Sequence, residues 1–185
     1  MTSLLHTFVG GTAGIWRVEG MRVIVGQTLP TVPRLSVVEN NQTTTPEGSS
    51  WLLRGITSYE RYVHKMERST LLVQQAELGR LEATRAALIP IKKSAAWWEL
   101  AQDERRAIFA ERSHHITIGL NYAARIARRL YHGFDLGEPF DFLTWFEFAS
   151  TDANAFEELV GKLRETEEWT YVEREVDIRL AREDT

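Results

Sequence analysis

The order of strand-like and helix-like segments in the second half of this chain restricts its fold more than any other feature. Six segments follow one another as strand, helix, strand, strand, helix and strand, and they occupy residues 85–92, 103–122, 124–132, 140–148, 151–164 and 169–180. This β-α-β-β-α-β order is the split βαβ, or ferredoxin-like, arrangement, in which the helices cover one face of an antiparallel sheet. The second half is therefore predicted to form one such unit.

Local patterns support these assignments. Residues 103–122, DERRAIFAERSHHITIGLNY, begin with carboxylates and have helical periodicity, which predicts one long helix containing both His114 and His115. Residues 133–139, GFDLGEP, lie between two alternating segments, and their glycines and proline favour the turn of a hairpin. Thr151 or Asp152 is predicted to cap the helix that follows.

The first half is richer in strands. Its β-branched and aromatic segments predict strands, which lie at residues 5–9, 16–25 and 51–56. The polar stretch 39–50 follows the short apolar run LSVVE and is interpreted as a surface loop, not as a domain linker. The first half has one long predicted helix, at 59–78, which ends at Gly79.

These elements predict a single domain. With only one long helix, residues 1–90 would be a reduced version of the unit formed by residues 91–185, and the two halves could close an α+β barrel. A chain of 185 residues is of ordinary size for one domain. We therefore expect one α+β domain over residues 1–185.

Composition excludes several classes of protein. A net charge of −4 and a pI near 5.8 give no reason to expect nucleic acid as a partner. Cysteine is absent, which excludes disulfides, thiolate ligands and covalent haem attachment through cysteine. No run approaches the ~20 apolar residues of a membrane span, and no secretory signal is recognisable at the N-terminus, so a cytoplasmic location without a membrane partner is expected.

His115 is the first candidate for chemistry. On a continuous helix it would share an apolar face with Ile108, Ile118, Gly119 and Tyr122. One interpretation is a core histidine satisfied by a backbone or carboxylate partner. The other is an axial ligand to haem iron, for which a neutral imidazole beside an apolar pocket is suited, with Gly119 leaving room for a flat cofactor.

Arg128 is the second candidate. Period-two alternation places it on one strand face with Ile126, Leu130 and His132. The neighbouring strand presents a face that is also largely apolar, formed by Phe142, Thr144, Phe146 and Phe148. A cation there costs free energy unless it is paired, which points to an anionic ligand or to a structural salt bridge.

Three residues after the strand at 85–92 could serve a flat cofactor with carboxylate substituents. Lys93 would supply a cation, and Trp97 and Trp98 would supply wide aromatic surfaces. Each alone is as consistent with ordinary core or surface packing. Common dinucleotide, phosphate, zinc-protease and serine-hydrolase motifs are absent from the sequence.

Four long segments carry a resemblance to a known family. They are EATRAALIPIKKSAAWWELAQDERRAIF, SHHITIGL, ARRLYHGFDLGEPFDFLTWFEFA and TEEWTYVEREVDIRL. They resemble the chlorite dismutases, specifically the short-chain lineage, and the resemblance is strong from about residue 51 to residue 180. It implies a homodimeric α+β barrel of two ferredoxin-like halves, with non-covalent haem b in the second half.

The resemblance also implies roles for individual residues. His115 would be the proximal iron ligand, bonded to Glu168 or, as the alternative, Glu167, and Arg128 would be the distal arginine. Lys93 and Trp97 would lie on the propionate side, and Trp98 near the haem or at a subunit contact. The remaining expected site residues line the distal pocket or approach the arginine, and they are Leu130, Thr144, Phe146 and Gln75.

The implied reaction converts chlorite into chloride and dioxygen. By resemblance it passes through a ferryl species and transient hypochlorite or chlorine monoxide, whose recombination forms the O–O bond, with Arg128 holding the anion. Two other functions stay open at this point. Coproheme decarboxylases share the fold but generally lack the distal arginine, and a non-enzymatic haem-binding protein, or a haem-free dimer, could use the same barrel.

Overall fold

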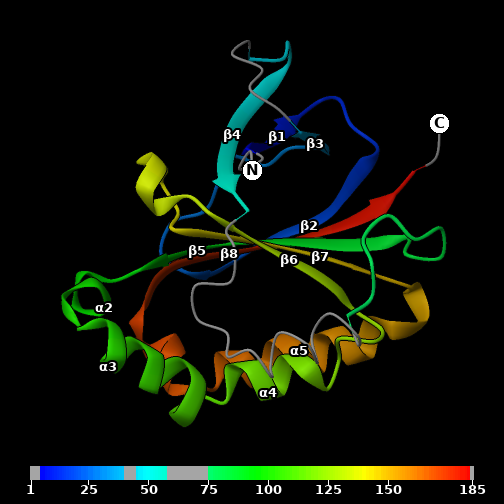
Figure 1. Cartoon of the computed structure of the whole chain (residues 1–185). Helices are drawn as coiled ribbons and strands as arrows, with labels where there is room; N and C mark the ends of the chain where they lie inside the picture. Colours follow the sequence, from blue (N-terminus) through cyan, green and yellow to red (C-terminus); the bar gives the residue numbers. More distant parts are fainter. Residues whose placement is uncertain (1–4, 40–44, 58–74, 184–185) are drawn as a thin grey trace.

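The computed structural model describes residues 5–39, 45–57 and 75–183, and its strands form a closed antiparallel barrel (Figure 1). The order around the barrel is β1-β3-β2-β8-β5-β7-β6-β4, and β4 pairs with β1 to close it. The strands are β1 (Leu5–Gly11), β2 (Trp16–Val25), β3 (Arg34–Glu39), β4 (Ser49–Ile56), β5 (Arg85–Lys93), β6 (Ala127–His132), β7 (Phe142–Phe148) and β8 (Val172–Arg182).

The two halves of the barrel have the same strand order. In each half the fourth strand lies beside the first, then come the third and the second, which gives β4-β1-β3-β2 and β8-β5-β7-β6. This is the strand order of the ferredoxin-like unit. The predicted α+β barrel of two such halves is therefore confirmed. One junction, β2 with β8, extends from Trp16↔Arg182 to Val25↔Glu175, whereas the other is formed at Ile56↔His132.

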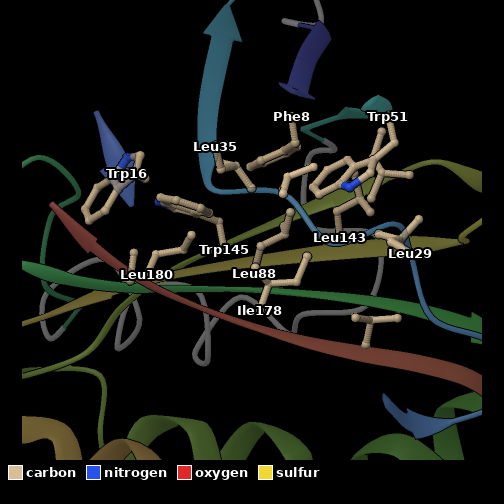
Figure 2. Close-up of a cluster of buried hydrophobic side chains, with 14 of the residues drawn as sticks. Phe8, Trp16, Leu29, Leu35, Trp51, Leu88, Leu143, Trp145, Ile178 and Leu180 are labelled. Atoms are coloured by element: carbon tan, nitrogen blue, oxygen red, sulfur yellow. The ribbon is translucent and has the colours of Figure 1, made fainter. Parts of the chain in front are cut away.

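Side-chain alternation separates a barrel interior from an outer face. On β5, Ala86 and Leu88 belong to the interior cluster, whereas Ala87, Ile89 and Ile91 belong to a second cluster on the outer face. Figure 2 shows the interior cluster, which includes Phe8, Trp16, Leu35, Trp51, Leu88, Leu143, Trp145, Ile178 and Leu180. Because aromatic and aliphatic side chains fill the interior, the barrel is a packed core.

The α-helices lie along the outer face of β5 to β8, on one side of the molecule (Figure 1). Helix α5 packs the apolar side chains of Phe156, Leu159 and Leu163 into the second cluster. The helical segments are α2 (Ala95–Glu99), α3 (Gln102–Arg106), the π-helix η1 (Ala107–Arg112), α4 (His115–Leu120), α5 (Ala153–Arg164) and the 3-10 turns Phe134–Leu136, Ser150–Asp152 and Glu167–Tyr171. No helix in the described part of the chain is long and apolar enough to span a membrane.

The prediction of one long helix at 103–122 is wrong. The segment divides into α3, the π-helix η1 and α4, and the division falls at His114, whose φ of 50° is left-handed. A side chain in that conformation interrupts a right-handed helix. The hydroxyl of Ser113 accepts a hydrogen bond from the backbone N–H of Glu168, so a contact distant in sequence stabilises the break.

The ends of other strands and helices also differ from the prediction. The strand expected from residue 169 begins at Val172 because Glu167–Tyr171 is a 3-10 turn, and the two strands before it begin at Ala127 and Phe142, later than expected. Strand β3 and helix α2 were not predicted. Most of the helix expected at 59–78 lies outside the described residues, and its last four residues, 75–78, are not helical. Gly79 does have the positive φ, 79°, typical of a helix-ending glycine.

Candidate functional site

A cavity of about 390 Å³ lies between the outer face of β5 to β8 and the helices. Nine of the ten residues that the sequence singled out line it, and they are Lys93, Trp97, Trp98, His115, Arg128, Leu130, Thr144, Phe146 and Glu168. Gln75 is not among the lining residues. Most other lining side chains are aliphatic or aromatic, so the cavity has the size and character of a cofactor pocket.

His115 is the first residue of α4, and its two ring nitrogens have different surroundings. Nδ1 lies 2.8 Å from Oε2 of Glu168. Nε2 is buried and has no hydrogen-bond partner among the described residues. A buried polar atom without a partner costs free energy, so Nε2 is suited to a ligand that would enter the cavity.

The main-chain break before α4 aims this imidazole. His114 itself is exposed, while His115 and Ser113 are buried. The hydroxyl oxygen of Ser113 lies 2.9 Å from the backbone nitrogen of Glu168. This hydrogen bond holds the break beside the residue whose carboxylate contacts His115. The π-helix η1 just before it is a rare element that is frequent at functional sites.

Glu168 is shared by two buried partners. Nζ of Lys93 donates to Oε1 at 2.9 Å, while Oε2 faces His115. Burial by itself would raise the pKa of Glu168, but His115 and Lys93 outweigh it and lower the pKa to about 2. Glu168 is therefore a carboxylate at neutral pH, and it is Glu168, not Glu167, that contacts the histidine. Glu167 pairs with Arg112 at the surface.

The protonation of His115 follows from its burial. Burial lowers the pKa of the imidazole, against the opposing effect of Glu168, and the nearby cations Arg128 and Lys93 lower it further. A neutral ring with its proton on Nδ1, donated to Glu168, leaves the lone pair of Nε2 available. A carboxylate-bound neutral imidazole facing an apolar cavity fits axial ligation of a haem iron.

A metal site made of protein ligands alone is not found in the described part of the chain. No group of three or more His, Cys, Asp or Glu side chains there could hold an ion. A single imidazole nitrogen is a donor that fits a metal held mainly by a bound group, as in a haem.

Arg128 lies in the cavity wall beside Leu130, Thr144 and Phe146. Pairing of β6 with β7 sets Arg128 opposite Phe146 and Leu130 opposite Thr144, as the alternation predicted. Burial lowers the pKa of the guanidinium, partly offset by Glu168, although it stays protonated at any neutral pH. No carboxylate of the described residues forms an ion pair with Arg128. Within this part of the chain, the interpretation of Arg128 as one half of a structural salt bridge is therefore not supported.

Two neighbours of Arg128 were also expected. A Cβ added to Gly119 would meet Nη1 of Arg128 at 4.0 Å, so the small residue on α4 faces the arginine. The amide of Gln75 donates to the backbone carbonyl of Arg128, not to its guanidinium. Gln75 does approach the arginine, but through the main chain of β6.

The position of Lys93 differs from that expected of a propionate partner. Its ammonium is buried, bonded to Glu168 and 4.4 Å above the ring of Trp97. Burial lowers the pKa of Lys93, and Glu168 opposes that effect. The structure therefore favours Lys93 as a support for Glu168. This pairing needs a contact between residues 75 apart, which no local pattern reveals.

Trp97 and Trp98 face different partners. Trp97 is buried and packs against Tyr171. Trp98 stacks on Phe134 with ring centroids 3.9 Å apart, and its Nε1–H donates to Oδ2 of Asp141 at 3.3 Å. Both tryptophans lie on the short helix α2, just after β5, and both line the cavity.

Several lining residues were missed. Phe109 lies 4.4 Å from the ring of His115 and Trp169 lies 6.4 Å away, centroid to centroid. Arg105 and Arg106 also line the cavity. The sequence showed them only as members of a charged helical segment, and nothing local distinguishes them from solvated surface residues.

Comparison with known proteins gives matches over most of the chain. The family model described as chlorite dismutase matches residues 27–183. A structure of dimeric chlorite dismutases from Nitrobacter winogradskyi is 56% identical with a TM-score of 0.90, over 96% of this chain and 99% of that one.

More distant matches agree in fold. Chlorite dismutase from Candidatus Nitrospira defluvii, solved in complex with imidazole, has a TM-score of 0.70 at 21% identity, over 98% of this chain and 92% of that one. Chlorite dismutase of Ideonella dechloratans is 35% identical over 86 residues, which is 46% of this chain. That match spans only 28% of the length of the Ideonella protein.

Proposed function

The chain belongs to the chlorite dismutase family, and on that premise we propose that it binds haem b non-covalently and converts chlorite into chloride and dioxygen. One observation carries the proposal. His115 is held through Nδ1 by Glu168, its Nε2 is buried without a partner among the described residues, and the cavity that it lines also contains Arg128. A neutral nitrogen ligand and a fixed cation thus line one largely apolar space.

The proximal side would hold the cofactor. His115 would bind the iron through Nε2, and Glu168 would keep the proton on Nδ1 and increase electron donation by the ring. Lys93 would hold Glu168 in place, since its ammonium contacts the other carboxylate oxygen at 2.9 Å. When bound, haem b would supply an iron centre that takes an oxygen atom from chlorite and gives it back when the O–O bond forms.

The distal side would bind the substrate. Arg128 would attract the chlorite anion, since a guanidinium in an apolar cavity wall, without an ion-pair partner among the described residues, is a strong site for a small anion. It would then retain transient hypochlorite until the O–O bond forms. Both chlorine–oxygen bonds of one chlorite break and its two oxygens become dioxygen, so atoms and charge balance as ClO₂⁻ → Cl⁻ + O₂. Leu130 and Phe146 would exclude water from the anion.

We also propose a single domain over residues 1–185 and a homodimer. The closed barrel supports one domain, because β2 and β8, from different halves, pair along their length. The Nitrobacter relative described as dimeric supports the homodimer. Light scattering coupled to size exclusion would give the mass, and a single species of one chain would contradict the dimer.

The function is tested by oxygen evolution. The full chain is reconstituted with haem b, chlorite is added in an oxygen electrode, and free haemin serves as the control. We expect one O₂ and one chloride per chlorite at a rate far above haemin. A histidine-ligated absorption spectrum that is lost in His115→Ala would support the ligand. Oxygen evolution no faster than haemin would overturn the proposed reaction.

Arg128 separates this proposal from coproheme decarboxylation. The cation is suited to holding a small anion in the distal space, and the resemblance associates its absence with the decarboxylases. Incubation with coproheme and peroxide, followed by product analysis, tests the alternative. Formation of haem b in that assay, without oxygen from chlorite, would favour a decarboxylase.

A further inference from the structure

The cations that line the cavity are not equivalent. Lys93 is bonded to Glu168, and Arg164 is bonded to the buried carboxylates of Glu175 and Asp177. Arg128 lies among the distal side chains on β6. Because Lys93 and Arg164 already have carboxylate partners, neither is well placed to receive the carboxylates of a cofactor.

Arg105 has a different environment. It lies in α3, lines the cavity, and its Nε is buried without a hydrogen-bond partner among the described residues. Its guanidinium carbon lies 5.3 Å from the ring of Trp98. No residue in the described part of the chain forms an ion pair with Arg105, and Asp135, which also lines the cavity, is not paired with it.

These observations point to a ligand. A buried guanidinium N–H without a partner costs free energy, and burial beside an indole holds the planar group in one orientation. Trp98 is fixed in turn from two sides, by stacking on Phe134 and by its hydrogen bond to Asp141. The guanidinium therefore lies on a rigid aromatic surface in the part of the cavity lining that α2 and α3 supply.

We propose that Arg105 binds a carboxylate of the haem, in the role that the sequence suggested for Lys93. This inference rests on the proposed function, because it requires haem b as the cofactor. Guanidinium and carboxylate form charge-assisted, often bidentate, hydrogen bonds. Nε is one of the two nitrogens that donate along one edge of the planar guanidinium. Trp98 acts as the positioning residue that holds Arg105.

The test compares two cofactors that differ only in their carboxylates. The full-length apoprotein is titrated with haem b and with haem b dimethyl ester, in which both carboxylates are esterified, and affinity is read from the Soret band. We expect Arg105→Ala to weaken haem b binding by about tenfold or more and to leave the affinity for the ester within about twofold. Arg105→Lys should restore part of the affinity for haem b.

Arg112→Ala is the matched control, because Arg112 follows in the same helical segment, pairs with Glu167 at the surface and does not line the cavity. It should change neither affinity. Equal losses for both cofactors in Arg105→Ala, an equal effect of Arg112→Ala, or no loss of haem b affinity would each overturn the assignment. Unchanged ester binding also shows that the variant is folded.

The same samples distinguish this inference from the proposed function. If the unaltered protein binds haem b but evolves no oxygen from chlorite, the reaction is wrong and the result with the ester still decides the role of Arg105. If the unaltered protein does not bind haem b at all, both are overturned.

Discussion

The carboxylate of Glu168 lies between Nδ1 of His115, at 2.8 Å, and Nζ of Lys93, at 2.9 Å. We predict that Glu168→Gln lowers oxygen evolution by about 10- to 100-fold, because the ring loses its anionic partner. The haem reduction potential should become more positive, since the ligand donates less electron density to the iron. Spectroelectrochemistry of the reconstituted protein measures the potential.

Glu167→Gln is the matched control for that variant. Glu167 is the neighbouring carboxylate, but it pairs with Arg112 at the surface and not with the imidazole. Its substitution should change neither the potential nor the rate. Similar shifts in both variants would show that general charge near the site, and not the contact with His115, sets the potential.

Arg128 gives a second prediction. Arg128→Ala should still bind haem with a histidine-ligated spectrum, yet lower turnover by about 10²- to 10³-fold, because the cation that holds the anion is missing. Hypochlorite should also escape, and a chlorination trap such as monochlorodimedone measures it. Unchanged turnover with no chlorination of the trap would remove Arg128 from the mechanism.

A control for Arg128 is its neighbour on the same strand. Arg129 is exposed and points to the opposite face of β6, so it does not line the cavity. Arg129→Ala should therefore retain the rate and leave the trap unreacted. Its behaviour separates the effect of the site from a general effect of removing a cation from this strand.

Features that depend on neighbouring residues could be predicted from the sequence, and features that depend on contacts distant in the sequence could not. Alternation on β6 and β7 is local, so the shared wall of Arg128, Leu130 and Thr144 followed from period two. The break before His115 was missed because it depends on Ser113 contacting Glu168, 55 residues away. The position of Lys93 on Glu168 was missed for the same reason.

The left-handed backbone at His114 leads to a prediction about the stability of its variants. His114 is exposed and its φ is 50°, so its side chain is constrained mainly by its own backbone. His114→Val should destabilise the fold by about 1–2 kcal/mol, since a β-branched residue is strained in the left-handed region. His114→Gly should be neutral or slightly stabilising. Urea unfolding of the two variants gives the free energies, and equal effects of Val and Gly would refute the backbone argument.

Asp177 makes a prediction about acid stability. It is almost fully buried, and although burial raises its pKa, hydrogen bonds and charges from Arg179 and Arg164 outweigh that effect and lower the pKa below its ordinary value. A lowered pKa means that folding favours the carboxylate. The stabilisation is therefore complete above the ordinary pKa of 3.8 and is lost as the pH falls through the folded pKa.

Asp177→Asn tests this by removing the charge. We expect the free energy of unfolding to fall by about 3 kcal/mol at pH 7, where two partly buried arginines lose a buried partner. The difference from the unaltered protein should be smaller at pH 3 and below. Urea unfolding across that pH range measures it. Glu158→Gln, which removes an exposed pair with Lys162, should follow the unaltered protein. The two curves of unfolding free energy against pH, for Asp177→Asn and for the unaltered protein, should converge in acid. A difference that stays constant down to pH 2 would mean that the carboxylate of Asp177 is not the titrating group.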